Sequence, residues 1–96
     1  GFEVRVAEEV IDFENAPAVK RELLKAQASG DFTVDLSDVK RADSAALSVL
    51  LSARRKAEAL GGRLAIEGLP ADLKTLARLY GVEEILGLPV EKTIER

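Results

Sequence analysis

Hydrophobic and polar residues alternate in three short stretches of this chain, and this period-2 pattern predicts β-strands. The stretches are residues 2–6, 32–36 and 63–67. In the first, FEVRV, three apolar side chains fall on one face and two charged side chains on the other. In the second, FTVDL, three apolar side chains face away from Thr33 and Asp35. Strands of this kind bury one face and expose the other.

Between and after the strands, apolar residues recur with the 3.6-residue period of amphipathic helices. The predicted helices cover residues 15–28, 44–60 and 70–80. Asp12 or Asn15 can cap the first helix and Asp43 or Ser44 the second, because these side chains accept hydrogen bonds from the free N–H groups of a helix start. The Gly61-Gly62 pair ends the second helix. In the third helix, the side chains expected to face the core are Leu73, Leu76, Ala77 and Tyr80.

The order strand-helix, repeated three times, predicts an α/β fold with parallel strands joined by right-handed crossovers. We expect a mostly parallel sheet of about four strands, with helices mainly on one face. Residues 37–42 are expected to form a loop, and residues 82–86 fit either a short strand or a helical turn. A single domain is expected over residues 1–96, with the polar residues 91–96 fraying.

Composition narrows the range of functions. With 47% apolar and 32% charged residues among 96, the chain has the balance of one soluble globular domain. It contains no His and no Cys, which excludes disulfides, zinc sites with imidazole or thiolate ligands, and His-based catalysis. A net charge of −3 without a basic block argues against a nucleic-acid partner. No apolar stretch approaches the ~20 residues of a membrane-spanning helix, so we expect no direct membrane insertion. Because the chain has no His, no Cys and no phosphate-binding motif, we also expect no cofactor and no metal.

The predicted helix over residues 44–60 has two different faces. Its core face consists of Ala46, Val49, Leu50, Ala53, Ala57 and Leu60. The opposite face consists of Ser44, Leu47, Ser48, Leu51 and Arg55. Two leucines beside small serines indicate a protein-docking surface, because serines permit close approach and leucines supply an apolar centre. The alternative is that Leu47 and Leu51 meet a neighbouring helix of the same domain.

Ser44 and the nearby acidic residues allow several interpretations. Ser44 can be a simple N-cap, or it can carry a phosphate, which the free N–H groups and dipole of a helix start tolerate. Asp35, Asp38 and Asp43 could bind Mg²⁺, although such clusters more often serve turns and caps. A Ser nucleophile would need a base such as Lys40, and nothing in the sequence specifies that arrangement.

Residues 33–47, TVDLSDVKRADSAAL, resemble the signature of STAS domains, which is a strand, a loop and Asp-Ser/Thr-x-Gly-Leu opening a helix. This family includes bacterial anti-anti-sigma factors, in which the Ser or Thr of the motif is phosphorylated. Ser44 is the matching position and Asp43 the matching acid. Ala46 stands where the family usually has Gly, which leaves slightly less room for a partner's backbone, and Glu8-Glu9 replaces the usual Gly after the first strand.

Residues 69–82, LPADLKTLARLYGV, are similar to a stretch of the MlaB-like STAS subunits of bacterial ABC transporters that move phospholipid between the outer and inner membranes. The resemblance extends over about residues 2–86. It implies a non-catalytic cytoplasmic subunit that binds the transporter's ATPase, an MlaF-like protein, and through it reaches the inner-membrane permease, in support of outer-membrane lipid asymmetry. The contact residues that the helix pattern and the resemblance suggest are Asp43, Ser44, Leu47, Ser48, Leu51 and Arg55.

Two alternatives to the transporter subunit remain open. One is an anti-anti-sigma factor regulated by phosphorylation of Ser44. The other is a small regulatory domain that binds a nucleotide or a lipid, for which the sequence contains no phosphate-binding motif.

Overall fold

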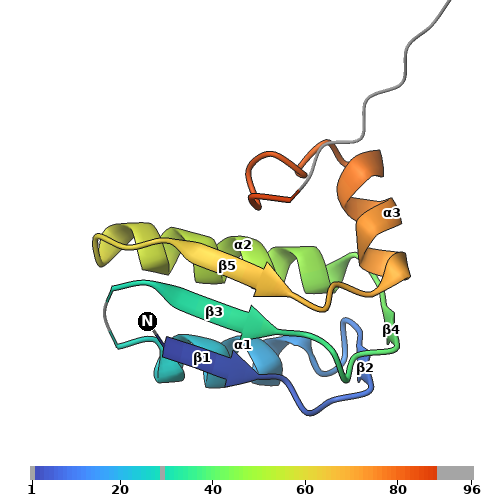
Figure 1. Ribbon diagram of the computed structural model, residues 1–96. Helices are drawn as coiled ribbons and strands as arrows, with labels where there is room; N and C mark the ends of the chain where they lie inside the picture. The colour runs from blue at the N-terminus through green and yellow to red at the C-terminus, as the bar shows by residue number, and fades with distance from the viewer. Residues whose placement is uncertain (1, 29, 89–96) are drawn as a thin grey trace, which may run out of the picture.

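Three parallel strands form the centre of the molecule. The computed structural model describes residues 2–28 and 30–88. Its main sheet contains β1 (Phe2–Arg5), β3 (Phe32–Asp35) and β5 (Leu64–Glu67) in the order β1-β3-β5 (Figure 1). β3 pairs in parallel with both neighbours. The three strands predicted from alternation are confirmed, each with one end displaced by one residue.

A second, smaller pair of strands follows β1 and β3 along the chain. β2 (Val10–Ile11) pairs in parallel with β4 (Arg41–Ala42). We expected a loop over residues 37–42 and about four strands in one sheet, whereas the main sheet has three and the remaining pairing is this separate ladder. Two residues cannot display a period-2 pattern, so alternation could not reveal these strands.

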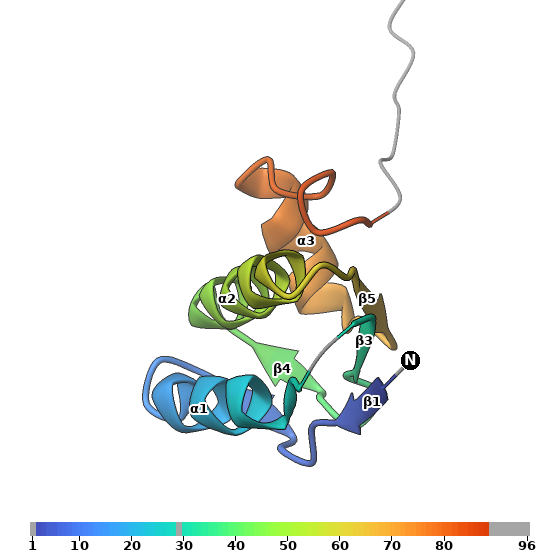
Figure 2. The same cartoon turned by 90° about the vertical axis from the view of Figure 1, so that its left-hand side faces the viewer.

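The three helices lie where the hydrophobic period predicts them: α1 (Ala16–Ala26), α2 (Ala45–Ala59) and α3 (Ala71–Leu79). Figure 2 shows α1 and α2 side by side on one face of the sheet, with α3 beyond α2. The α/β class with helices mainly on one face is therefore confirmed. None of these helices, within the described residues, has the length and apolar character needed to cross a bilayer.

After α3 the chain makes a helical turn, because the N–H of Leu86 donates to the carbonyl of Val82 at 3.0 Å. Of the two alternatives for residues 82–86, the structure therefore has the turn. The expected fraying of residues 91–96 lies outside the described residues.

The core lies between the sheet and the helices. Phe32, Val34 and Leu36 are buried on the inner face of β3 and just beyond it, as their alternation predicts. The predicted core face of α2 is also buried except for Leu60, which is 40% exposed. Leu60 is the residue after the last helical turn, so the chain has already left the core side there.

The third helix buries fewer residues than the pattern predicts. Leu73 and Ala77 are fully buried and Leu76 is half-buried, as expected. Tyr80, however, is 57% exposed, so its prediction as a core residue is wrong. Tyr80 follows the last residue of α3, Leu79, and therefore no longer lies on the buried stripe.

Candidate docking surface around Ser44

Helix α2 begins at an exposed serine whose hydroxyl is not used by the helix. Ser44 occupies the N-cap position, but its side chain makes no capping hydrogen bond. The neighbouring carboxylate caps the helix instead, because Oδ1 of Asp43 accepts a hydrogen bond from the N–H of Ala45 at 2.8 Å. The interpretation of Ser44 as a simple cap is therefore wrong, and its hydroxyl is left free for another role.

The carboxylate of Asp43 also ties the start of α2 to the loop before α1. Its Oδ2 accepts a hydrogen bond from the N–H of Phe13 at 3.1 Å. That loop is held from within, since Oδ1 of Asp12 accepts from the N–H groups of Glu14 and Asn15 at 3.0 and 3.1 Å. As a result the backbone of Phe13 is fixed beside α2 while its side chain is 76% exposed.

A shallow groove runs from Ser44 toward the end of α3. The residues that line it are Ala42, Asp43, Ser44, Asp72, Thr75, Leu76 and Tyr80, and we call it the Ser44 groove. Oδ2 of Asp72 lies 3.4 Å from the backbone nitrogen of Ala42 and so connects α3 to β4 across the groove. The exposed ring of Tyr80 borders it, and a part-exposed aromatic ring is a common anchor for a protein partner.

The Ser44 groove offers acidic groups and hydroxyls. Two carboxylates and the hydroxyls of Ser44, Thr75 and Tyr80 line it, and its described lining contains no Lys or Arg. Both oxygens of Asp43 are engaged by backbone N–H groups, so that carboxylate is not placed to deprotonate Ser44. The lining can therefore accept hydrogen bonds and basic groups.

The exposed face of α2 is narrower than the sequence predicts. Leu47 is only 5% exposed and belongs to the same buried cluster as Leu73 and Ala77 of α3. Helix α3 packs against α2 and covers the side of α2 that carries Leu47. The prediction that Leu47 anchors a partner is wrong, and the alternative of contact with a neighbouring helix is correct for this residue.

The other predicted contact residues of α2 keep some exposure. Ser48 and Arg55 are exposed, and Leu51 is half-buried against the edge of the core. With Ser44 they form a stripe at helical spacing along α2. That this stripe binds a partner stays a prediction.

Two exposed aromatic residues near the groove were missed by sequence reasoning. Tyr80 was assigned to the core, and Phe13 was not assigned any role. Phe13 stands between two acidic residues, outside every periodic pattern. An aromatic residue without apolar neighbours at helical or strand spacing has no buried face to join, so the sequence could have indicated that Phe13 is exposed.

The acidic residues at the end of β3 have structural partners. Oδ1 of Asp35 accepts hydrogen bonds from the hydroxyl of Ser37 at 2.5 Å and from its N–H at 2.9 Å, while Nε of Arg5 lies 3.5 Å from Oδ2. The hydroxyl of Ser37, then its N–H and the charge of Arg5, lower the pKa of Asp35, so this carboxylate stays ionised. Within residues 2–28 and 30–88 no three acidic, His or Cys side chains are grouped to hold a metal ion.

Comparison with known proteins identifies the family. The family model described as "Mlab, STAS domain" matches residues 3–88, a range that includes the motif at residues 33–47, the motif at residues 69–82 and the whole Ser44 groove. A search among curated proteins found no match. The match covers most of the 96 residues, and the chain therefore belongs to the MlaB-like family of STAS domains.

Proposed function

We propose that this protein is the STAS subunit of an Mla-type ABC transporter. It is a non-catalytic cytoplasmic protein that docks on the transporter's ATPase, supports its assembly and activity in phospholipid trafficking, and reaches the inner-membrane permease only through that ATPase. Membership of the MlaB-like family supports this role.

The observation that carries the proposal is the set of exposed groups around the start of α2. Phe13, whose backbone N–H bonds to Asp43, is 76% exposed, and Tyr80, which lines the groove with Ser44, is 57% exposed. The hydroxyl of Ser44 is not used for capping. Burying such rings on a partner removes apolar area from water at roughly 25 cal/mol per Å². Aromatic anchors around a small polar centre are typical of the energetically important part of a protein interface.

The stripe along α2 extends this surface. Leu51 contributes an apolar edge, and Ser48 permits close approach of a partner's backbone. Arg55, exposed at the far end, fits the charged rim of an interface, where its contribution to affinity is small. We therefore expect the strongest effects of substitution near Ser44 and the weakest at Arg55.

Co-purification with the ATPase of an Mla-type transporter tests the proposal. Wild-type protein should co-purify, and Ser44→Glu should not, because it adds bulk and an unpaired charge to a surface that is desolvated on binding. Ser44→Ala loses one hydrogen bond and should weaken binding about fivefold. Tyr80→Ala should also fail to co-purify while keeping the wild-type fold.

Two exposed residues away from the groove provide matched controls. Ala28→Glu places the same charge at a small, exposed residue after α1, and Ile85→Ala truncates another apolar side chain, which is 46% exposed. Both should bind like wild type. Binding of the ATPase by Ser44→Glu at wild-type strength, or no binding by the wild-type protein, would contradict the proposal.

One observation favours a second candidate, an anti-anti-sigma factor. A phosphate on the exposed hydroxyl of Ser44 would sit at the N-terminus of a 15-residue helix, where the dipole favours negative charge. In this alternative a kinase acts on Ser44, and the phosphate switches off binding to that same kinase.

Intact-mass measurement on protein from its native cells separates the two candidates. The transporter subunit should be unmodified and bound to an ATPase. A substantial species heavier by one phosphate, mapped to Ser44 and found without the ATPase, would favour the sigma-factor pathway instead.

A further inference from the structure

The two edges of the main sheet differ in what lies beside them. Beside the outer edge of β5, residues 84–87 help to form a groove with Arg63 to Ile66, and Leu86 is buried there (Figure 1). At the other edge, β1 pairs only with β3, and no other strand among the described residues pairs with it. An unpaired strand edge is a template for a further strand.

The backbone groups at the free edge of β1 can be assigned. The N–H of Val6 donates to the carbonyl of Asp35 at 3.0 Å, so even-numbered residues of this segment direct their backbone groups toward β3. Because these directions alternate along a strand, the N–H and C=O groups of Glu3 and Arg5 point away from the sheet. A strand added at this edge would therefore bond to Glu3 and Arg5.

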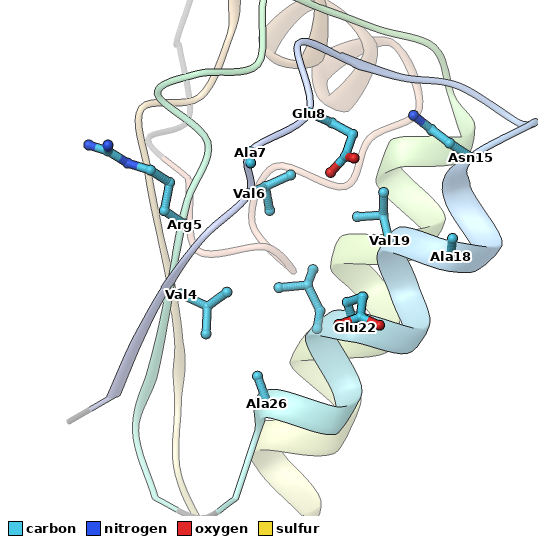
Figure 3. A pocket seen from close by; sticks show the side chains of 11 residues that line it. Val4, Arg5, Val6, Ala7, Glu8, Asn15, Ala18, Val19, Glu22 and Ala26 are labelled. Carbon is cyan, nitrogen blue, oxygen red and sulfur yellow. The ribbon is translucent and has the colours of Figure 1, made fainter.

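An apolar groove lies beside the same edge. Figure 3 shows Val4 of β1 and Val6, just after β1, pointing toward α1, while Arg5 points away from the helix. The residues of α1 that line this groove include Ala18, Val19, Leu23 and Ala26. Val4 is only half-buried, although its neighbour in β3, Val34, is fully buried. An apolar side chain from an added strand would fill the open side of Val4.

We propose that this edge binds a second copy of the chain, with β1 antiparallel to the β1 of its partner and Val4 on the twofold axis. In this register Glu3 of each copy lies directly opposite Arg5 of the other, so both cross-strand pairs join opposite charges. The two Val4 side chains meet as a close pair over the groove. The main sheet becomes six strands in the order β5-β3-β1-β1-β3-β5.

Charge and backbone geometry select the same register. Sliding the strands by one residue puts Glu3 or Arg5 opposite Val4, whose backbone groups already face β3. Sliding them by two residues puts Glu3 opposite Glu3 or Arg5 opposite Arg5 on the axis, and like charges directly opposite are unfavourable. With Val4 on the axis, Glu3 faces Arg5, and these are the residues whose N–H and C=O groups point outward. They can therefore form the closely spaced hydrogen-bonded pairs of an antiparallel ladder.

The side chain of Arg5 lies on the exposed face of the sheet and keeps N–H donors for this contact. Its Nε lies 3.5 Å from Asp35 and 3.8 Å from Asp38 on the exposed face of the sheet. These two ion pairs use Nε, and a guanidinium carries further N–H donors on its terminal nitrogens for a second carboxylate. Ser44 does not line this groove, so the inference is independent of the proposed function.

Sedimentation velocity of the full chain over a range of concentrations tests the proposal. Wild-type protein should show a monomer–dimer equilibrium. Glu3→Arg replaces both attractive pairs with repulsive ones and should raise the dissociation constant about tenfold or more. Glu67→Arg is the matched control, since Glu67 lies in the same row as Arg5 and Asp35 but at the opposite edge, and it should dimerise like wild type.

A mixture provides the decisive measurement. Arg5→Glu alone should also dissociate, whereas Glu3→Arg mixed with Arg5→Glu restores both opposite-charge pairs and should form a heterodimer. Circular dichroism tests whether each variant is folded. If Arg5→Glu is not folded, Glu3→Pro replaces it as a test of the backbone pairing. Glu3→Pro removes an outward N–H and should also abolish the dimer.

Several outcomes would overturn the proposal. Wild-type protein that stays monomeric up to a concentration of about 0.5 mM has no such interface, because even a weak dimer would be populated at that concentration. A dimer that survives Glu3→Arg uses another surface, and two folded variants that do not associate when mixed exclude the charge-paired register. Capture of an extended segment of a different protein at β1, without self-association, would assign the edge to that partner instead.

Discussion

The two ends of helix α2 are built differently, although one helix connects them. At its C-terminal end, polar groups and glycines lock α2 to the rest of the fold. At its N-terminal end, the cap is made by Asp43, and Ser44 faces an open groove with its hydroxyl unused. We call the C-terminal end of α2 the closed end, because these contacts hold the domain together there. We call the N-terminal end the open end, because it is the end that we propose for a partner.

The C-terminal end is fixed by close contacts to α1 and to the turn before β3. Nζ of Lys56 donates to the carbonyl of Leu24, and Nε2 of Gln27 donates to the carbonyl of Ala53 at 3.0 Å. Just after the helix, Gly62 packs so tightly that a methyl group there would overlap the carbonyl group of Gly30. These contacts hold α1, α2 and the turns before β3 and β5 together.

The largest effect we expect marks the boundary between the core and the open end. Leu47→Asp should destabilise the domain by about 4 kcal/mol, because it buries an unpaired carboxylate in the cluster under α3. The next residue, Ser48, is exposed, so Ser48→Asp should change the free energy of unfolding by no more than about 0.5 kcal/mol. Urea unfolding of the two variants measures the difference.

The pair also tests the extent of the docking surface. Ser48→Asp should remain folded and lose affinity for the ATPase, whereas Leu47→Asp should fail to bind because it is unfolded. A folded Leu47→Asp protein would show that α3 leaves this side of α2 and would return Leu47 to the docking surface.

The positions of the helices and main strands followed from the sequence because each has enough residues to show its period. Residues 44–60 carry more than four helical turns of pattern, and the observed helix differs from the prediction by one residue at each end. β2 and β4, with two residues each, fall below that length. Their pairing depends on the chain leaving β1 and β3 in the same direction, which is a tertiary effect that no local pattern records.

The candidate site was predicted less completely, and for a different reason. A helical wheel ranks residues by angle, but burial depends on what packs against the helix. The wheel put Leu47 on the face opposite the core, yet the residue is buried in the cluster that also contains Leu73 and Ala77 of α3. Likewise, which of Asp43 and Ser44 caps α2 depends on side-chain geometry, since both residue types can accept the same hydrogen bond.

The second effect in size concerns the closed end. Gly62→Ala should destabilise the domain by about 3 kcal/mol, because its new methyl group collides with the backbone of Gly30, which cannot move as a side chain can. Gly61→Ala is the matched control. Gly61 has a φ of +82°, but nothing lies within 4 Å of an added methyl group, so only backbone strain of about 1 kcal/mol applies.

Thermal unfolding of the two glycine variants gives the comparison directly. If Gly61→Ala is at least as damaging as Gly62→Ala, conformational strain rather than packing governs the closed end, and the close contact between Gly62 and Gly30 does not tie α2 to β3.

The smallest effect is expected at Gln27, the buried polar side chain between α1 and α2. It is 4% exposed, and although its Nε2 donates to Ala53, its Oε1 has no hydrogen-bond partner among the described residues. An unsatisfied buried oxygen costs about as much as one hydrogen bond contributes. Gln27→Leu removes the unpartnered oxygen together with the hydrogen bond to Ala53 and keeps most of the side-chain volume. The free energy of unfolding should therefore change by less than about 1 kcal/mol.

Two further variants at this position show whether packing or polarity holds α1 to the closed end. Gln27→Ala leaves a cavity and should cost about 2 kcal/mol, while Gln27→Glu buries a carboxylate and should cost more at about pH 7 than at about pH 4, where the acid is partly neutral. With volume as the main contribution, stability should fall in the order Leu, Ala, Glu at neutral pH. A loss of more than about 2 kcal/mol in Gln27→Leu would instead mean that the hydrogen bond to Ala53 is a principal link between α1 and α2, and that the closed end is held by polar contacts as much as by packing.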